Sequence, residues 1–116
     1  MINILIEKKS ENILALSATG HSGYAEAGSD IVCSAVSTLT ENLILSLKEV
    51  LAIAPIYEID EQKPALRVEL HVLSEKKMRE AQILMKSTVL GLKDVAKSYK
   101  KYIKIKNKYR ISDYFA

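Results

Sequence analysis

Apolar residues alternate with other residues along the first part of the chain. Ile2, Ile4 and Ile6 recur at every second position, which places all three on one face of a predicted β-strand. A polar stretch over residues 8–12 predicts a turn, and residues 13–18 predict a second strand. The chain therefore opens with a predicted β-hairpin.

The apolar spacing changes to three or four residues over about residues 30–51, which predicts a helix. Its apolar stripe consists of Val32, Val36, Leu39, Leu43, Leu47 and Val50. Pro55 ends this pattern, because proline has no backbone N–H and its ring clashes with the preceding helical turn.

A second pair of strands is predicted after this helix, over residues 56–59 and from Leu66 onward, with a turn over residues 60–64. The later strand has the most regular alternation in the chain: Leu66, Val68, Leu70 and Val72 on one face, and Arg67, Glu69 and His71 on the other. His71 is therefore predicted to be a surface histidine.

Ser74 is a predicted N-cap for a second helix, because its hydroxyl can accept a hydrogen bond from the first turn. The buried stripe of this helix is expected to contain Met78, Ala81, Met85, Val89, Leu92 and Val95. A last strand is predicted over residues 102–106.

These elements follow the order strand-strand-helix-strand-strand-helix-strand. Short turns between neighbouring strands favour antiparallel pairing, and each helix has one apolar face to bury. The predicted fold class is α+β, with two layers: a mostly antiparallel sheet and two helices on one face of it. We expect residues 1–116 to form a single domain.

Composition narrows the cellular setting. The chain is 48% hydrophobic and 27% charged, as in ordinary soluble domains. It has one cysteine, so it cannot form an internal disulfide and gives no reason to expect an oxidising compartment. We expect no apolar run to approach the roughly 20 residues of a membrane span. The prediction is a cytoplasmic protein with no membrane partner.

The net charge of +3 is unevenly distributed. Residues 97–110 contain seven basic side chains and no acidic one, interleaved with Tyr99, Tyr102 and Tyr109. One interpretation is an anionic partner, through a transient contact with RNA or the ribosome. The other is an edge strand whose lysines discourage edge-to-edge pairing, since Ile103 and Ile105 alternate with lysines.

Residues 20–33 contain the candidate catalytic residues of the chain. This segment holds the only cysteine, one of the two histidines and three of the four glycines. Cys33 falls in the first turn of the predicted helix, where the dipole contributes about 0.3–1 kcal/mol to a negative charge. That is too little to activate a thiol, so a base is required, and His21 is the nearby candidate.

Supporting residues each have two interpretations. Asp30 either caps the helix or accepts a hydrogen bond from His21 and orients the imidazole. Ser37 bonds either near the thiol or back to the helix backbone. Backbone N–H groups of the first turn could form an oxyanion hole without any side chain.

The three glycines of the segment are Gly20, Gly23 and Gly28. They serve either turns with positive φ or a substrate loop that opens and closes over the thiol. His21, Cys33 and Asp30 lack the spacing and number expected of zinc ligands, so we expect no metal and no cofactor.

The combined motif Gly20-His21, then Gly28-Ser29-Asp30-Ile31-Val32-Cys33 and on to Ser37, resembles the signature of the ribosomal-processing cysteine protease family, Prp. Ser22 stands where an alanine is common in that family. The resemblance implies a bacterial endopeptidase that removes a short N-terminal extension from a large-subunit ribosomal protein. It also implies His21 as base, Cys33 as nucleophile, Asp30 as a supporting residue, a homodimer, and a loop ordered by substrate.

Two other hypotheses stay open. A non-catalytic ribosome- or RNA-binding domain would use the basic C-terminal stretch but gives no reason to gather glycines, histidine and cysteine in one segment. A redox sensor would oxidise Cys33 reversibly, and its resolving cysteine could come only from a second subunit.

Overall fold

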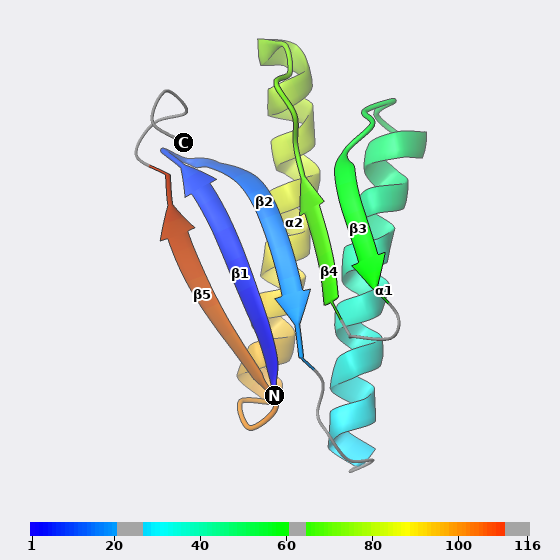
Figure 1. Ribbon diagram of the computed structural model, residues 1–116, viewed down its shortest axis with the longest axis vertical. Helices are drawn as coiled ribbons and strands as arrows, with labels where there is room; N and C mark the ends of the chain where they lie inside the picture. Colours follow the sequence, from blue (N-terminus) through cyan, green and yellow to red (C-terminus); the bar gives the residue numbers. More distant parts are fainter. Residues whose placement is uncertain (21–26, 61–64, 111–116) are drawn as a thin grey trace.

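The computed structural model describes residues 1–20, 27–60 and 65–110, with residues 27–30 described through their backbone. The elements are β1 (Ile2–Lys9), β2 (Asn12–Thr19), α1 (Ala27–Glu49), β3 (Ile56–Asp60), β4 (Ala65–Glu69), α2 (Glu75–Ser98) and β5 (Ile103–Tyr109) (Figure 1). The predicted order of strands and helices is therefore confirmed.

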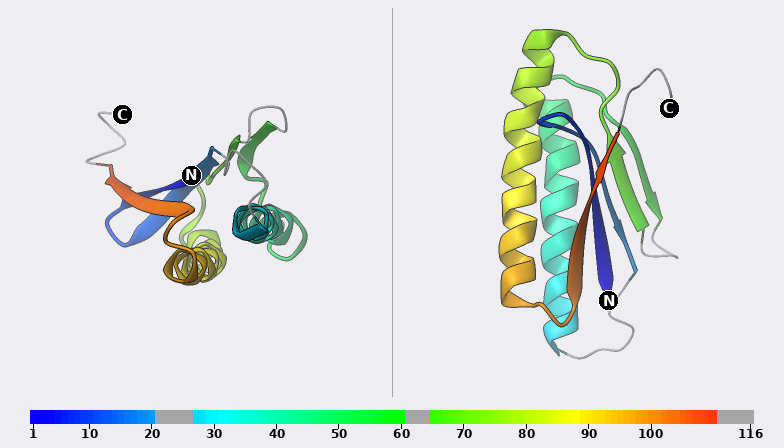
Figure 2. Two further views of the ribbon diagram at one scale, coloured as in Figure 1. Left: turned by 90° about the horizontal axis from the view of Figure 1, so that it is seen from below. Right: turned by 90° about the vertical axis from the view of Figure 1, so that its left-hand side faces the viewer.

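The five strands form one sheet in the order β3-β4-β2-β1-β5. β5 runs parallel to β1 at one edge, and all other neighbours are antiparallel. Both helices cover the same face of the sheet, which leaves the other face open to solvent (Figure 2). The predicted two-layer α+β fold is confirmed.

The core lies between the helices and the covered face of the sheet. Ile6 of β1 pairs with Leu16 of β2, which pairs with Val68 of β4, and all three side chains are fully buried. Burial of each such side chain contributes about 1.5–3 kcal/mol. The predicted stripe of α2 faces this layer, since Ala81 and Met85 are fully buried within it.

Gln82 of α2 bonds the backbone of β2 close to an irregularity in the first hairpin. The β1–β2 register shifts between Glu7 and Lys8, and Ile13 lies beyond the end of the β2–β4 ladder. The buried side chain of Gln82 accepts a hydrogen bond from the Ile13 N–H and donates one to its carbonyl oxygen, both at 2.8 Å. Gln82 thus replaces a strand partner for the Ile13 backbone.

The first helix differs from its prediction at both ends. It begins at Ala27 rather than near residue 30, and it ends at Glu49. Val50 was predicted to continue the stripe but is 72% exposed. The chain reverses at Ala52, whose φ is +54°, and Ile53 then covers the end of the core with its N–H bonded to the Leu47 carbonyl at 2.8 Å.

Two strand boundaries also differ from prediction. β4 ends at Glu69, because the chain leaves the sheet to reach the N-cap Ser74, whose hydroxyl accepts from the Lys77 N–H. Val72 is consequently 96% exposed instead of lying on a buried strand face. β5 extends three residues beyond the predicted end because its parallel pairing with β1 continues to Tyr109.

The expectation that no apolar run approaches the length of a membrane span is wrong. By length and composition, one helix in the described part of the chain could cross a membrane. Residues 31–49 of α1 are long and apolar enough to qualify, with a mean hydropathy of 1.2. One third of this stretch is buried in the fold, and α1 packs against α2. A core helix of a soluble protein passes the same test, so the stretch is weak evidence for a membrane segment.

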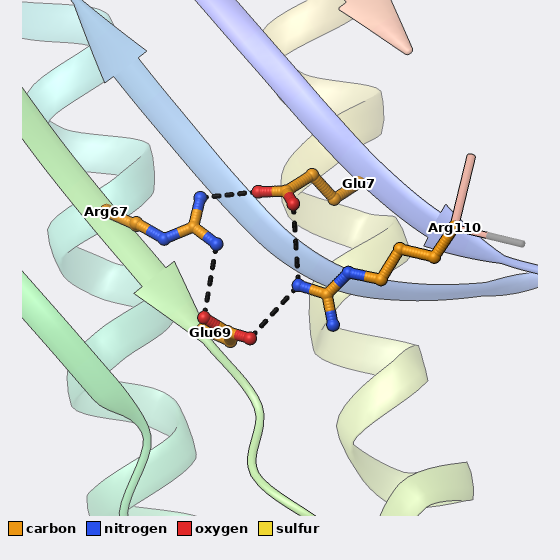
Figure 3. A network of polar contacts seen from close by, with 4 residues as sticks. All are labelled: Glu7, Arg67, Glu69 and Arg110. Carbon is orange, nitrogen blue, oxygen red and sulfur yellow. Dashed lines mark hydrogen bonds and ion pairs between the residues drawn. The ribbon is translucent and has the colours of Figure 1, made fainter. Parts of the chain in front are cut away.

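Four charged side chains form a closed ring on the open face of the sheet (Figure 3). Arg67 bonds to Glu7 and, at 3.1 Å, to Glu69, while Arg110 lies 3.4 Å from Glu7 and 3.0 Å from Glu69. The ring crosses β2 above Ala15, which stands opposite both glutamates in the register. A small side chain at this position leaves room for the ring.

Candidate active site

One side of α1 faces a pocket of about 340 Å³. The residues that it contributes are Cys33, Val36, Ser37, Thr40 and Glu41. Their spacing of three and four residues places them on a single helix face. Cys33 is half-buried there, and Ser37 is exposed beside it, one turn further along the helix.

The remaining walls come from the sheet. Ile2, Ala18 and Gly20 line the pocket from the first hairpin, and Ile59, Asp60, Ala65 and Leu66 line it from the β3–β4 hairpin. Ile2, Ala18 and Leu66 are buried, whereas Glu41 and Asp60 are exposed. The pocket therefore has an apolar floor with two carboxylates among the exposed residues around it.

Cys33 lies in the second turn of α1, because the helix begins at Ala27. The prediction of a first-turn position is wrong. The N–H groups without a helical partner belong to the preceding turn, about 5.4 Å along the axis. The helix dipole also weakens beyond the first turn, so activation of the thiol depends still more on another group.

Asp30 is the fourth residue of α1 and so cannot be its N-cap. The capping interpretation is therefore wrong. The side chain of Asp30 lies outside the described part of the chain, and its supporting role stays a prediction.

Gly20 brings the chain to the pocket in a conformation that favours glycine. Its φ is +86°, and a Cβ atom at this position would lie 2.5 Å from the Met1 carbonyl oxygen. The interpretation as a positive-φ glycine is confirmed for this position. Gly28 lies inside α1 instead of in a turn, and Gly23 lies outside the described residues.

His21 also lies outside the described residues, so its pairing with Cys33 stays a prediction. What the structure does bring together is Gly20, to which His21 is bonded, and Cys33, on the two sides of one pocket. The other histidine, His71, is exposed on the surface as predicted, with Nδ1 2.9 Å from the Val72 carbonyl oxygen.

The residues that line the pocket opposite Cys33 were not predicted from the sequence. Glu41 could have been found by continuing the helix face two turns beyond the thiol. Ile59, Asp60, Ala65 and Leu66 gave no local signal, because only the sheet pairing brings the second hairpin beside α1. Thr40 is buried, with its hydroxyl donating to the Val36 carbonyl at 2.8 Å.

No metal site is found among the side chains of residues 1–20, 31–60 and 65–110. No three histidine, cysteine, aspartate or glutamate side chains come together there in a way that could hold an ion. The pocket places the Cys33 thiol beside an apolar cavity, an arrangement that suits a cysteine hydrolase.

Comparison with known proteins identifies the kind of cysteine hydrolase. The family model described as Cysteine protease Prp matches residues 1–104, and the chain belongs to this family of cysteine proteases. A curated relative, the ribosomal processing cysteine protease Prp of Bacillus subtilis (strain 168), is 24% identical over 107 residues, covering 90% of this chain and 96% of the relative.

Solved structures share the fold over nearly the whole chain. SMU.848 from Streptococcus mutans has a TM-score of 0.85 and 27% identity, covering 95% of this chain and 96% of that one. The essential ribosomal processing protease Prp from S. aureus, in complex with a substrate peptide, has a TM-score of 0.82 and 20% identity, covering 93% and 100%. The five-stranded sheet and two helices are thus an arrangement found in known Prp structures.

Proposed function

We propose that this cysteine protease removes a short N-terminal extension from a large-subunit ribosomal protein, with Cys33 as nucleophile and His21 as general base. The observation that carries the proposal is the placement of Cys33 in a pocket whose opposite wall includes Gly20, the neighbour of His21. The ribosomal substrate is supported by the similarity to the B. subtilis relative, which is a ribosomal processing cysteine protease.

The reaction would begin when His21 takes the proton from the Cys33 thiol. The thiolate attacks the scissile carbonyl carbon, and the resulting oxyanion is stabilised by backbone N–H groups of the turn before Cys33. The C–N bond then breaks, and the leaving amine takes the proton from the imidazolium. Water, deprotonated by His21, hydrolyses the thioester and regenerates the thiol.

Asp30 and Ser37 would support this chemistry without forming a bond to the substrate. Asp30 is proposed to orient the His21 imidazole, as the third member of other triads does. Ser37 faces the pocket one helical turn after Cys33, which suits it to a hydrogen bond with bound peptide. We propose that the chain around Gly20 and Gly23 closes over the peptide, whereas Gly28 belongs to α1.

The pocket suits a peptide with an apolar side chain near the cleaved bond. Its volume of about 340 Å³ and its buried floor of Ile2, Ala18 and Leu66 favour burial of such a side chain. The exposed carboxylate of Glu41 would favour a basic residue beside it, through charge complementarity.

A cleavage assay on the precursor tests the proposal. The ribosomal protein with its extension is incubated with enzyme, and intact-mass analysis measures the product. We expect Cys33→Ala to abolish cleavage and to keep the wild-type circular dichroism spectrum, because this half-buried side chain is small. Ser34→Ala, an exposed neighbour on the same helix, is the matched control and should keep full activity. Near-wild-type turnover of the Cys33→Ala protein would overturn the proposal.

We also propose that the enzyme works in the cytoplasm, where its substrate is made, and as a homodimer. The single cysteine is consistent with a reducing compartment. Light scattering coupled to size exclusion measures the subunit number directly, and a monomeric mass at assay concentration would overturn the dimer.

A further inference from the structure

Three lysines form a row on the open face of the sheet. Lys104, Lys106 and Lys108 occupy alternate positions of β5, so all three side chains project from the same face at intervals of about 6.6 Å. All three are exposed, and none forms an ion pair with another residue in the described part of the chain. β5 is one of the two edge strands of the sheet (Figure 1).

A shallow hollow of about 320 Å³ lies beside this lysine row. It is lined by Asn3, Ile4, Leu5, Ser17, Thr19, Lys104 and Lys106. The strand register aligns Lys104 with Asn3 and Thr19, and aligns Lys106 with Leu5 and Ser17. Lys104 therefore has Asn3 and Thr19 beside it, and Lys106 has Ser17 two strands further into the sheet.

The acidic residues of the open face do not neutralise the positive charge of the lysine row. Glu7 stands beside Lys108 in the register, but its charge is balanced within the ring by Arg67 and Arg110. Glu58 and Asp60 lie on β3, at the opposite edge of the sheet. The open face is thus basic along β5.

We propose that the lysine row and the adjoining hollow bind the phosphodiester backbone of an RNA strand. Lysines supply the attraction to phosphate, and Asn, Ser and Thr side chains are frequent hydrogen-bond donors to phosphate oxygens. A lipid surface fits less well, because Leu5, the apolar side chain on the lysines' face of β1 in this hollow, is half-buried, and the Ile4 side chain is buried in the core on the other face.

Edge protection explains part of this pattern but not all of it. Lysines on an edge strand discourage pairing with another chain. That role does not require Asn3, Ser17 or Thr19, which lie on the neighbouring strands and line the same hollow. A binding function accounts for both the charges and the donors beside them.

The proposed RNA surface is separate from the thiol pocket. The lysine row lies on the open face along β5, whereas Cys33 of α1 lines a pocket together with the β3–β4 hairpin. The helix α1 lies on the covered face of the sheet (Figure 2). RNA binding and peptide cleavage can therefore be tested independently, and the inference does not depend on the proposed function.

Fluorescence anisotropy of a short labelled single-stranded RNA tests the proposal. The triple variant Lys104→Gln, Lys106→Gln, Lys108→Gln should bind at least ten-fold more weakly than wild type at a fixed salt concentration. With about 0.7 counterions released per phosphate contact, the slope of log K against log salt should become less steep by roughly 2. Thr19→Val should weaken binding as well, without changing the charge.

The matched control is Lys76→Gln, Lys86→Gln, Lys93→Gln, which removes the same charge from exposed positions of α2. It should bind RNA like wild type, apart from a small effect of net charge. Peptide cleavage should be unchanged in both triple variants. Equal loss of RNA binding in the two triple variants, no loss in either, or tighter binding to anionic phosphatidylserine vesicles than to RNA would each overturn the proposal.

Discussion

Cys33 lies half-buried in the second turn of α1, beside Val32 and Val36 of the buried stripe. Its helix neighbours toward the pocket are Ser37 and Thr40, so the thiol borders both the core and an open cavity. Half-burial leaves part of the Cys33 side chain facing the pocket. In the proposed reaction a second group removes the thiol proton, since the helix terminus lies a full turn away.

We predict that His21→Ala lowers the cleavage rate at least about 10²-fold, the usual contribution of general-base catalysis. The same change should slow alkylation of Cys33 by iodoacetamide at neutral pH, because less thiolate is present. His71→Ala, which removes the exposed histidine, is the matched control and should change neither rate. An unchanged profile of alkylation rate against pH in His21→Ala would show that His21 does not set the thiolate population.

The helix α1 has two functions along its length. One face carries Val32, Val36, Leu43 and Leu47 into the core, while the adjoining face presents the thiol side of the pocket. Its C-terminal end is shaped by Ala52, which adopts the left-handed conformation that normally favours glycine. This reversal directs Ile53 back into the core and leads the chain to β3, whose far end lines the pocket.

We predict that Ala52→Gly raises the free energy of unfolding by about 1 kcal/mol, because an L-residue pays roughly 1–2 kcal/mol for the left-handed conformation. Part of that gain is offset by the greater freedom of glycine in the unfolded chain. The matched control is Ala54→Gly, an exposed alanine two residues later without positive φ, which should destabilise slightly. Urea denaturation measures both, and equal destabilisation by the two variants would contradict the argument.

In the molecule as a whole, the charge ring joins segments that are distant in sequence. Glu7 comes from β1, Arg67 and Glu69 from β4, and Arg110 directly follows β5. Burial alone would raise the pKa of Glu7, but the hydrogen bond and charge of Arg67, together with Arg110, outweigh it and lower that pKa below its ordinary value of 4.5. The ring therefore links three strands on the otherwise open face.

The lowered pKa of Glu7 predicts a loss of stability in acid. The stabilisation is fully present above 4.5, the ordinary value, and is lost as pH falls through the lower value of the folded state. We predict that Glu7→Gln lowers the free energy of unfolding by about 1–3 kcal/mol near neutral pH. Urea denaturation at a series of pH values should show this difference shrinking below pH 4.5.

Glu11→Gln is the control for this titration, because Glu11 is an exposed carboxylate in the first hairpin turn. It should have little effect at any pH. A difference between wild type and Glu7→Gln that stays constant down to strong acid would contradict the assignment of the acid sensitivity to Glu7.

Local sequence patterns predicted the seven elements, the two-layer class and the segment that carries the thiol. They succeeded because the spacing of apolar residues by two, or by three and four, depends only on near neighbours. This spacing identifies buried faces such as that of Ile2, Ile4 and Ile6 directly. They failed at the ends of α1 and β4, where Ile53 and Ser74 redirect the chain. The end of a helix or strand depends on the tertiary contacts of the residues that follow it, and the local spacing of apolar residues does not predict those contacts.

The pairing of distant segments came only from the folded chain. The sheet order puts β5 beside β1, brings the β3–β4 hairpin opposite Cys33, and lets the charge ring pass over Ala15. The same pairing sets Asn3 and Thr19 beside Lys104. Such contacts depend on the free energy of burying whole faces of the sheet and helices against one another. This free energy cannot be inferred from a single stretch of neighbouring residues.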